Sequence, residues 1–97
     1  MSPACPGAHL KDDFLEPLGI TPYRLARLID VPITRVTRII NGQTRISVDT
    51  ALRLARFFGN SAQFWLNLQS DYELQLAEAS GETRRIEHEV QPFHASS

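Results

Sequence analysis

Apolar side chains recur at helical spacing over most of the chain. Leu10, Phe14 and Leu18, for example, follow one another at intervals of four residues and would share one face of a helix. No stretch before residue 84 alternates apolar and polar positions as a half-buried strand does. The pattern predicts five helices, over residues 8–18, 22–29, 32–41, 48–58 and 62–79.

The ends of these helices carry residue types that begin or end helices. Hydroxyl side chains that can accept hydrogen bonds from a helix N-terminus precede three of them: Thr21, Ser47 and Ser61. Glycines, which readily take up the left-handed conformation, follow four of them: Gly19, Gly42, Gly59 and Gly81. The sequence therefore predicts an all-α, five-helix bundle over residues 8–80. Residues 1–7 form an N-terminal segment, and residues 81–97 form a tail with room for one short extended piece at 85–90.

Length and composition indicate one small soluble domain. A chain of 97 residues can bury a single modest core, and 42% hydrophobic with 22% charged residues is ordinary for a globular protein. No apolar run approaches the roughly 20 residues of a membrane span, and the first residues do not resemble a signal peptide. The lone Cys5 cannot form an internal disulfide, which fits a reducing compartment. We expect a cytoplasmic protein without membrane contact.

The charge is distributed unevenly, although the net charge is only −1. Residues 24–56 contain seven arginines and two aspartates, a local charge of +5, whereas the remaining segments together carry −6. A basic middle between acidic ends is typical of a surface that binds a polyanion. Charge alone fits the solvated face of a helical bundle equally well.

The predicted helix 32–41 has two chemically distinct sides when its residues are projected at about 100° per residue. Its apolar arc would anchor it to the domain: Ile33, Val36, Ile39 and Ile40. The opposite arc and its flanks carry hydroxyl, guanidinium and amide groups: Thr34, Arg35, Thr37, Arg38 and Asn41. No carboxylate occurs between residues 31 and 48, whereas an ordinary surface helix mixes acids with bases. Because such side chains can bond base edges and phosphates, we interpret this helix as a recognition helix followed by a phosphate-contacting loop.

The segment LARLIDVPITRVTRIINGQTRIS resembles the helix-turn-helix core of the phage-repressor and Cro-like (XRE) class. A longer stretch, with TALRLARFFGNSAQFWLNLQ as its distinctive part, resembles the HigA-type antitoxins of bacterial toxin–antitoxin modules over roughly residues 6–78. In the turn, Asp30 stands in place of the usual glycine and Pro32 in place of a capping serine. Near the N-terminus, Cys5-Pro6-Gly7-Ala8-His9 stands in place of His-Pro-Gly-Glu-Ile, which leaves the role of that segment open.

The resemblance implies roles for individual residues. It implies base contacts from Thr34, Thr37 and Arg38, with Ile33 against a thymine methyl group. Phosphate contacts are expected from the following residues: Tyr23, Arg24, Arg35, Asn41, Thr44 and Arg45. Together these residues would cover one face of the helix-turn-helix.

Some residues have a second interpretation. Asn41, next to Gly42, is also placed to end the helix, and both roles can hold together. Tyr23 has the alternative of a half-buried core aromatic. Arg53 and Arg56, on the predicted helix 48–58, fit a solvated face better than a DNA contact.

The predicted helix 62–79 carries more apolar surface than a small core can cover. Trp65, Leu68, Tyr72 and Leu76 form one stripe, and Phe64 lies beside it. Operators with two half-sites need paired recognition helices, so we assign Phe64, Trp65, Leu68 and Tyr72 to the interface of a homodimer. The alternative is that Trp65 simply closes the core.

The sequence offers little for catalysis or metal binding. The histidines His9, His88 and His94 lie near the two ends, outside any recognisable nucleophile motif, and His88 with His94 is a weak metal pair. Gly-rich phosphate loops and the HExxH and CxxC motifs do not occur. We therefore expect no enzymatic activity, no cofactor and no metal site.

The HigA resemblance implies an antitoxin that also represses its own operon. Its partners would be a double-stranded DNA operator, a second copy of the chain, and a HigB-like mRNA-cleaving toxin that it neutralises by binding. Two other functions fit the same residues: a stand-alone transcriptional regulator without a toxin, and a protein-interaction module whose DNA surface is vestigial. The acid-free outer arc of helix 32–41 disfavours the second of these, because a disused surface would be free to acquire acids.

Overall fold

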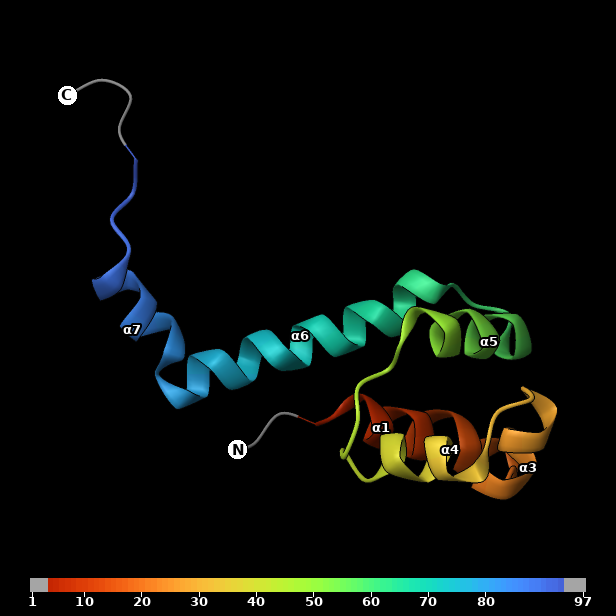
Figure 1. Cartoon of the computed structure of the whole chain (residues 1–97). Helices are drawn as coiled ribbons and strands as arrows, with labels where there is room; N and C mark the ends of the chain where they lie inside the picture. Colours follow the sequence, from red (N-terminus) through yellow and green to blue (C-terminus); the bar gives the residue numbers. More distant parts are fainter. Residues whose placement is uncertain (1–3, 94–97) are drawn as a thin grey trace.

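Residues 4–93 are described by the structure, a computed structural model in which this part of the chain contains helices and no strand (Figure 1). The elements are α1 (Pro6–His9), η1 (Leu10–Leu15), α2 (Glu16–Leu18), α3 (Pro22–Leu28), α4 (Ile33–Ile40), α5 (Val48–Phe58), α6 (Ala62–Ser80) and α7 (Glu82–Glu89). The first three follow one another without a break, so residues 6–18 form one helical rod whose middle part, η1, is π-helical. The all-α prediction is confirmed, and the first helix begins two residues earlier than predicted.

The predicted N-caps are present. Thr21 Oγ1 accepts a hydrogen bond from the backbone N–H of Arg24 at 3.1 Å, and Ser61 Oγ accepts one from Phe64 at 3.0 Å. Ser47 caps α5 in the same way, at 3.2 Å from the amide three residues further on. These bonds satisfy amides that helix geometry leaves without a partner, and they define where α3, α5 and α6 begin.

The core is centred on Trp65, whose side chain has no exposed surface. The centroid of its ring lies 4.9 Å from the ring centroid of Phe14 and 5.8 Å from that of Phe58. Its Nε1 donates a hydrogen bond to Asn60 Oδ1 at 2.8 Å. The buried aliphatic side chains of the same core are Leu10, Leu15, Leu25, Ile29, Val36, Ile39, Ile46 and Leu54. The prediction that Trp65 lies in a dimer interface is wrong, because its own subunit encloses the indole ring.

The N-terminal segment packs directly on the inner side of α4. Pro6 and Gly7 are buried, and a Cβ atom added at Gly7 would lie 1.9 Å from the carbonyl oxygen of Ile39. Only a residue without a side chain lets two backbones approach so closely. The segment from Cys5 to His9, whose role the sequence left open, is therefore part of the support beneath α4.

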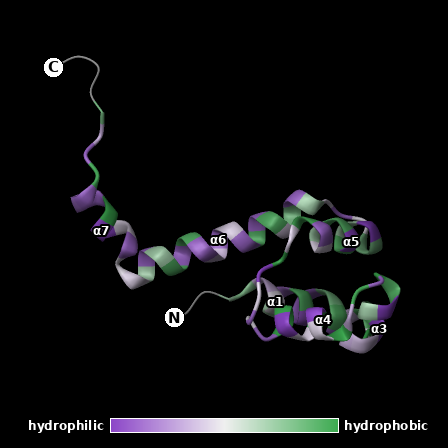
Figure 2. Cartoon of the chain, viewed as in Figure 1, coloured by the Kyte–Doolittle hydropathy of each residue, from purple (hydrophilic) through white to green (hydrophobic). Residues whose placement is uncertain are grey.

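α6 extends beyond the other helices and leads into α7, with polar and apolar residues interspersed along both (Figures 1 and 2). The predicted extended piece at 85–90 is wrong, because residues up to Glu89 belong to α7 and only Val90 has an extended backbone. Arg85 pairs with Glu82 at 3.8 Å and with Glu89 at 3.6 Å, and it is helical spacing that brings such charges together. His94 and the rest of the predicted tail beyond residue 93 lie outside the described residues, as do residues 1–3 of the predicted N-terminal segment. Within the described part, neither α6 nor any other helix is long and apolar enough to cross a membrane.

Candidate nucleic-acid interface

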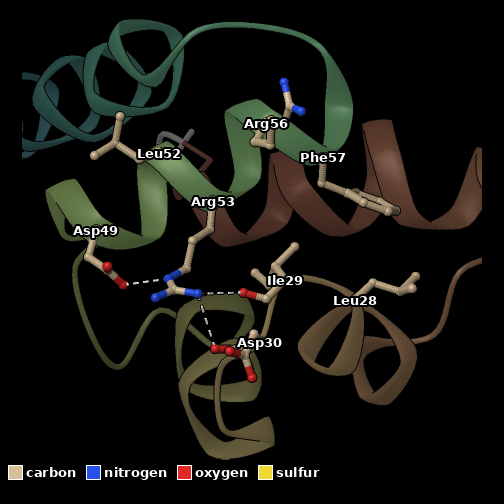
Figure 3. A pocket seen from close by; sticks show the side chains of 8 residues that line it. All are labelled: Leu28, Ile29, Asp30, Asp49, Leu52, Arg53, Arg56 and Phe57. Carbon is tan, nitrogen blue, oxygen red and sulfur yellow. Dashed lines mark hydrogen bonds and ion pairs between the residues drawn. The ribbon is translucent and has the colours of Figure 1, made fainter.

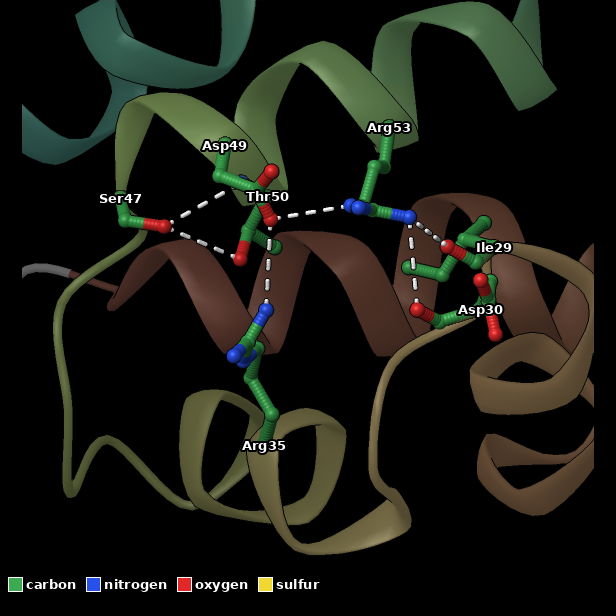
Figure 4. Close-up of polar contacts among 7 residues, drawn as sticks. All are labelled: Ile29, Asp30, Arg35, Ser47, Asp49, Thr50 and Arg53. Carbon is green, nitrogen blue, oxygen red and sulfur yellow. Dashed lines mark hydrogen bonds and ion pairs between the residues drawn. The ribbon is translucent and has the colours of Figure 1, made fainter.

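α3 and α4 pack against each other across a tight turn, residues 29–32. Asp30 has a left-handed backbone with φ of 58°, as expected for a residue that stands in place of glycine. Arg53 of α5 holds this turn, since its Nη1 donates to the carbonyl oxygens of Ile29 at 3.0 Å and Asp30 at 3.3 Å (Figure 4). Arg53 therefore supports the turn and is not merely part of a solvated face.

α4 presents one side to the core and the other to solvent. Val36 and Ile39 are buried, whereas Thr34 and Arg38 are exposed. Arg38 takes part in no ion pair among the described residues. The Thr37 hydroxyl lies 3.2 Å from two backbone carbonyl oxygens of the preceding turn and donates to them, which leaves its own oxygen free only to accept.

A carboxylate of α5 joins the exposed helix to the residue that holds the turn. Asp49 Oδ2 lies 3.3 Å from Arg35 Nη1 and 2.9 Å from Arg53 Nε (Figure 4). The spacing of Asp49 and Arg53 on one helix is visible in the sequence, but the contact with Arg35 joins residues 14 positions apart and depends on the fold. α4 has no acid in its own sequence, but in the folded protein an acid of the next helix lies against it.

The loop between α4 and α5, residues 41–47, is held by α6. Buried Gln69 accepts a hydrogen bond from the amide of Ile46 at 3.2 Å and donates to Glu73 at 3.2 Å. Glu73 binds Arg45 through two parallel bonds, Nε to Oε2 at 2.6 Å and Nη2 to Oε1 at 3.0 Å. Sequence reasoning found neither Gln69 nor Glu73, because both lie more than 20 residues from the loop they hold.

The other predicted phosphate contacts lie on the surface. Asn41 is exposed and is the C-cap residue of α4, just before Gly42 with φ of 71°, so its helix-ending role is confirmed and its phosphate contact stays a prediction. Thr44 is exposed in the loop. Tyr23 is 60% exposed beside Arg24 at the start of α3, and the alternative of a core aromatic is therefore wrong.

The Arg45–Glu73 pair is expected to make the stability of the fold depend on pH. The hydrogen bond from Arg45, helped by Gln69 and by the arginine charge, holds the pKa of Glu73 below its ordinary value of 4.5, although desolvation acts in the opposite sense. Because the folded-state pKa is the lower one, the stabilisation is complete above pH 4.5 and is lost as the pH falls through the folded-state pKa.

Glu73→Gln is therefore expected to lower the melting temperature at neutral pH and to reduce its fall on acidification. Thermal denaturation between neutral pH and about pH 3 measures both effects. Glu78→Gln, on the same helix but without an ion pair among the described residues, is the matched control. A Glu73→Gln profile parallel to that of the wild type would show that the pair contributes no pH dependence.

The arrangement of α3, turn and α4, with an exposed basic helix in second place, defines a protein of the helix-turn-helix class. The helix-turn-helix family model matches residues 13–65, which contain this unit, α5 and the first residues of α6. The match covers more than half of the chain.

Comparison with similar proteins identifies a family within the helix-turn-helix class. The antitoxin HigA of Pseudomonas aeruginosa, solved with the higBA promoter, is 46% identical with a TM-score of 0.86, covering 95% of this chain and 99% of that one. An addiction module antidote protein of the HigA family from Coxiella burnetii is 41% identical with a TM-score of 0.87, covering 96% and 100%. Virulence-associated protein I of Dichelobacter nodosus is 41% identical over 81 residues, 84% of this chain and 75% of the relative. The chain belongs to the HigA-type antitoxin family of helix-turn-helix proteins.

Proposed function

We propose that this chain is a cytoplasmic antitoxin that represses its own operon by binding operator DNA and neutralises a HigB-like, mRNA-cleaving toxin. The observation that carries the DNA-binding role is the exposed side of α4, where Thr34 and Arg38 face solvent and the helix itself contains no acid. The similarity to a HigA solved with its promoter, over nearly the whole chain, supports the same role. The toxin partner follows from membership of the family.

Four side chains of α4 are proposed to face the bases: Ile33, Thr34, Thr37 and Arg38. Arg38 can donate two hydrogen bonds to O6 and N7 of a guanine. Since the Thr37 hydroxyl donates within the helix, its oxygen suits the exocyclic amine of an adenine or a cytosine. Ile33 is half-buried against the core and offers only an edge to a thymine methyl group.

Six residues are proposed to contact phosphates: Tyr23, Arg24, Arg35, Asn41, Thr44 and Arg45. Arg35 and Arg45 are each held by a carboxylate, which fixes their direction without using all their donors. A guanidinium has five N–H groups, and the bidentate bond to Glu73 occupies two of those on Arg45. The Arg45 side chain is also 70% exposed, so it can contact a phosphate while it stays paired with Glu73.

A homodimer is part of the proposal, because an operator with two half-sites is bound by two recognition helices. Without Trp65, the interface predicted on α6 consists of Phe64, Leu68 and Tyr72. Phe64 is 39% exposed, whereas Leu68 and Tyr72 are half-buried and Leu68 packs against the core. These three residues stay candidates for a partner contact.

Binding to the DNA immediately upstream of the gene tests the repressor role. Fluorescence anisotropy should show an affinity at least about 10³-fold higher for this DNA than for a scrambled duplex. The binding constant should also fall steeply with salt, because basic side chains displace counterions from phosphates. Equal affinity for both duplexes would contradict a sequence-specific repressor.

Expression of the small gene adjacent to that of this chain tests the antitoxin role. Its product alone should arrest bacterial growth, and co-expression of this chain should restore growth and yield a stable complex on purification. If neither neighbouring gene product is toxic and the upstream DNA is still bound specifically, the chain is a stand-alone regulator.

A further inference from the structure

Two arginines of the proposed DNA-contacting surface each have a carboxylate of their own chain beside them. Arg45 is bound by Glu73 of α6 at 2.6 and 3.0 Å, and Arg35 lies 3.3 Å from Asp49 of α5. Among residues 4–93, the two other arginines proposed to contact DNA form no ion pair: Arg24 and Arg38. The two carboxylates therefore offset half of the positive charge that these four arginines would present to phosphates.

A buried side chain holds Glu73 in place beside Arg45. Gln69 is only 6% exposed, and it donates to Glu73 Oε2 at 3.2 Å while it accepts from the amide of Ile46 at 3.2 Å. These bonds connect the carboxylate to the backbone of the loop whose arginine it binds. A phosphate that approaches Arg45 would therefore meet the guanidinium and the carboxylate together, and two anions would share one cation.

Asp49 is also held in place, in its case by two arginines. Its Oδ2 accepts from Arg35 and, at 2.9 Å, from Nε of Arg53, which is itself bonded to the carbonyl oxygens of the turn at residues 29 and 30 (Figure 3). The Asp49 side chain is 57% exposed. Its charge is therefore close enough to solvent to act on a phosphate bound by Arg35.

We propose that Glu73 is a specificity-determining residue, whose carboxylate offsets the charge of Arg45 and so restrains binding to DNA of unrelated sequence. Asp49 acts on Arg35 in the same way. The inference rests on the proposed function in one respect, because it takes the surface of α4 and the loop that follows it to be the surface that meets DNA.

The carboxylate weakens binding to unrelated DNA more than binding to the operator. Binding to unrelated sequences comes almost entirely from attraction between basic side chains and phosphates, so it falls when a basic side chain is offset. Operator binding also draws on base contacts, which a carboxylate beside Arg45 leaves intact. The pair with Glu73 also fixes the direction of Arg45 before DNA arrives, which reduces the entropy lost in a complex of fixed register.

A purely structural role for Glu73 makes the opposite prediction. If the carboxylate only kept the loop of residues 41–47 in place, its removal would loosen the loop and lower the affinity for every duplex. The proposed role predicts that the affinity for unrelated DNA rises instead. The sign of the change therefore separates the two roles.

Glu73→Gln tests the proposal, with binding to the upstream DNA and to a scrambled duplex measured by fluorescence anisotropy. At a salt concentration of about 0.1 M, the affinity for the scrambled duplex should rise by about 3- to 10-fold, because charges closer than the Debye length of about 10 Å still repel each other. The affinity for the upstream DNA should change by less than about twofold, since the fixed direction of Arg45 is lost as its charge is freed. The slope of log K against log salt should steepen for the scrambled duplex.

Glu78→Gln is the matched control. It makes the same change of charge at an exposed position of the same helix, where the side chain forms no ion pair among the described residues. Both affinities should stay close to those of the wild type, because the net charge of the whole chain is not what restrains binding.

Asp49→Asn is the second variant, and it decides the question alone if Glu73→Gln loses its helical signal in circular dichroism. It should also strengthen binding to the scrambled duplex. An unchanged or lower affinity for that duplex in the folded variant, or an equal rise with Glu78→Gln, would overturn the inference. If Glu73→Gln but not Glu78→Gln strengthens binding to the scrambled duplex, while the wild type shows no preference for the upstream DNA, Glu73 keeps this role and the repressor function is refuted.

Discussion

Replacing Gly7 by alanine is expected to lower the free energy of unfolding by about 3 kcal/mol, at the upper end of what overpacking usually costs. The added methyl group would lie 1.9 Å from the carbonyl oxygen of Ile39 and 2.6 Å from Cα of Ile40. Because both are backbone atoms at the end of α4, no side-chain rotation can relieve the overlap, and the rod of residues 6–18 must move away from α4. Urea denaturation followed by circular dichroism measures the loss.

Gly19→Ala is the matched control for this change. It adds the same methyl group at a position where, apart from the neighbours along the chain, no atom of residues 4–93 lies within 4 Å, so only the left-handed backbone, with φ of 67°, opposes it. Its cost should be about 1 kcal/mol. If Gly7→Ala proved no more harmful than Gly19→Ala, the close approach of the N-terminal segment to α4 would be refuted. If it is more harmful, operator binding should fall as well, because the same contact supports α4.

Arg38→Ala is expected to weaken binding to the operator by about 1–3 kcal/mol and to relax discrimination at one or two base pairs. The physical reason is that Arg38 is exposed on α4 and engaged in no ion pair among the described residues, so its donors are available for a base edge. Titration of single-base operator variants by fluorescence anisotropy locates the affected positions. Binding to a random duplex should change much less.

Arg45→Ala is the contrasting change. It should weaken all duplexes similarly and reduce the slope of log K against log salt by about one unit, because one phosphate contact is lost. Glu73→Gln controls for the intramolecular pair, since it releases Arg45 without removing the positive charge. If Arg38→Ala and Arg45→Ala lowered specific and random binding to the same extent, the division into base-reading and phosphate-contacting arginines would be wrong.

Local features of this fold could be predicted from the sequence because their causes are local. The hydroxyl of Thr21 reaches an amide three residues away, and the periodicity of Val36 and Ile39 fixes which side of α4 is buried. The prediction that Trp65 lies in a dimer interface was wrong because the apolar stripe on α6 indicates that its side chains are buried but does not indicate which part of the molecule buries them. Only the ring of Phe14, about fifty positions earlier, and the rest of the core show that the subunit itself encloses the indole.

The residue types of the candidate site could be predicted from the sequence, but the side chains that hold them in place could not. Thr34 and Arg38 could be assigned to an outer face because they lie on one helix. The carboxylates that hold Arg35 and Arg45 come from α5 and α6, at separations of 14 and 28 residues, where spacing along the chain carries no information about contact. The error at α7 has a different origin, because its signals are local: the segment has few apolar residues and shows no clear period, but its ion pairs at helical spacing favour a helix.

The Asp49 carboxylate limits how the operator preference of this scaffold can be re-engineered. This carboxylate contacts both Arg35 and Arg53. Replacing Arg35 therefore changes a candidate DNA contact and, at the same time, removes the ion pair that orients α4 over its neighbour. Within residues 4–93 the side chains of Thr34 and Arg38 form no such ion pair, so both positions can be randomised without altering the docking angle of the helix. A selection for new operators should therefore yield variants at positions 34 and 38 that change the preferred operator sequence without a second substitution. Variants at position 35 should need a compensating substitution at position 49.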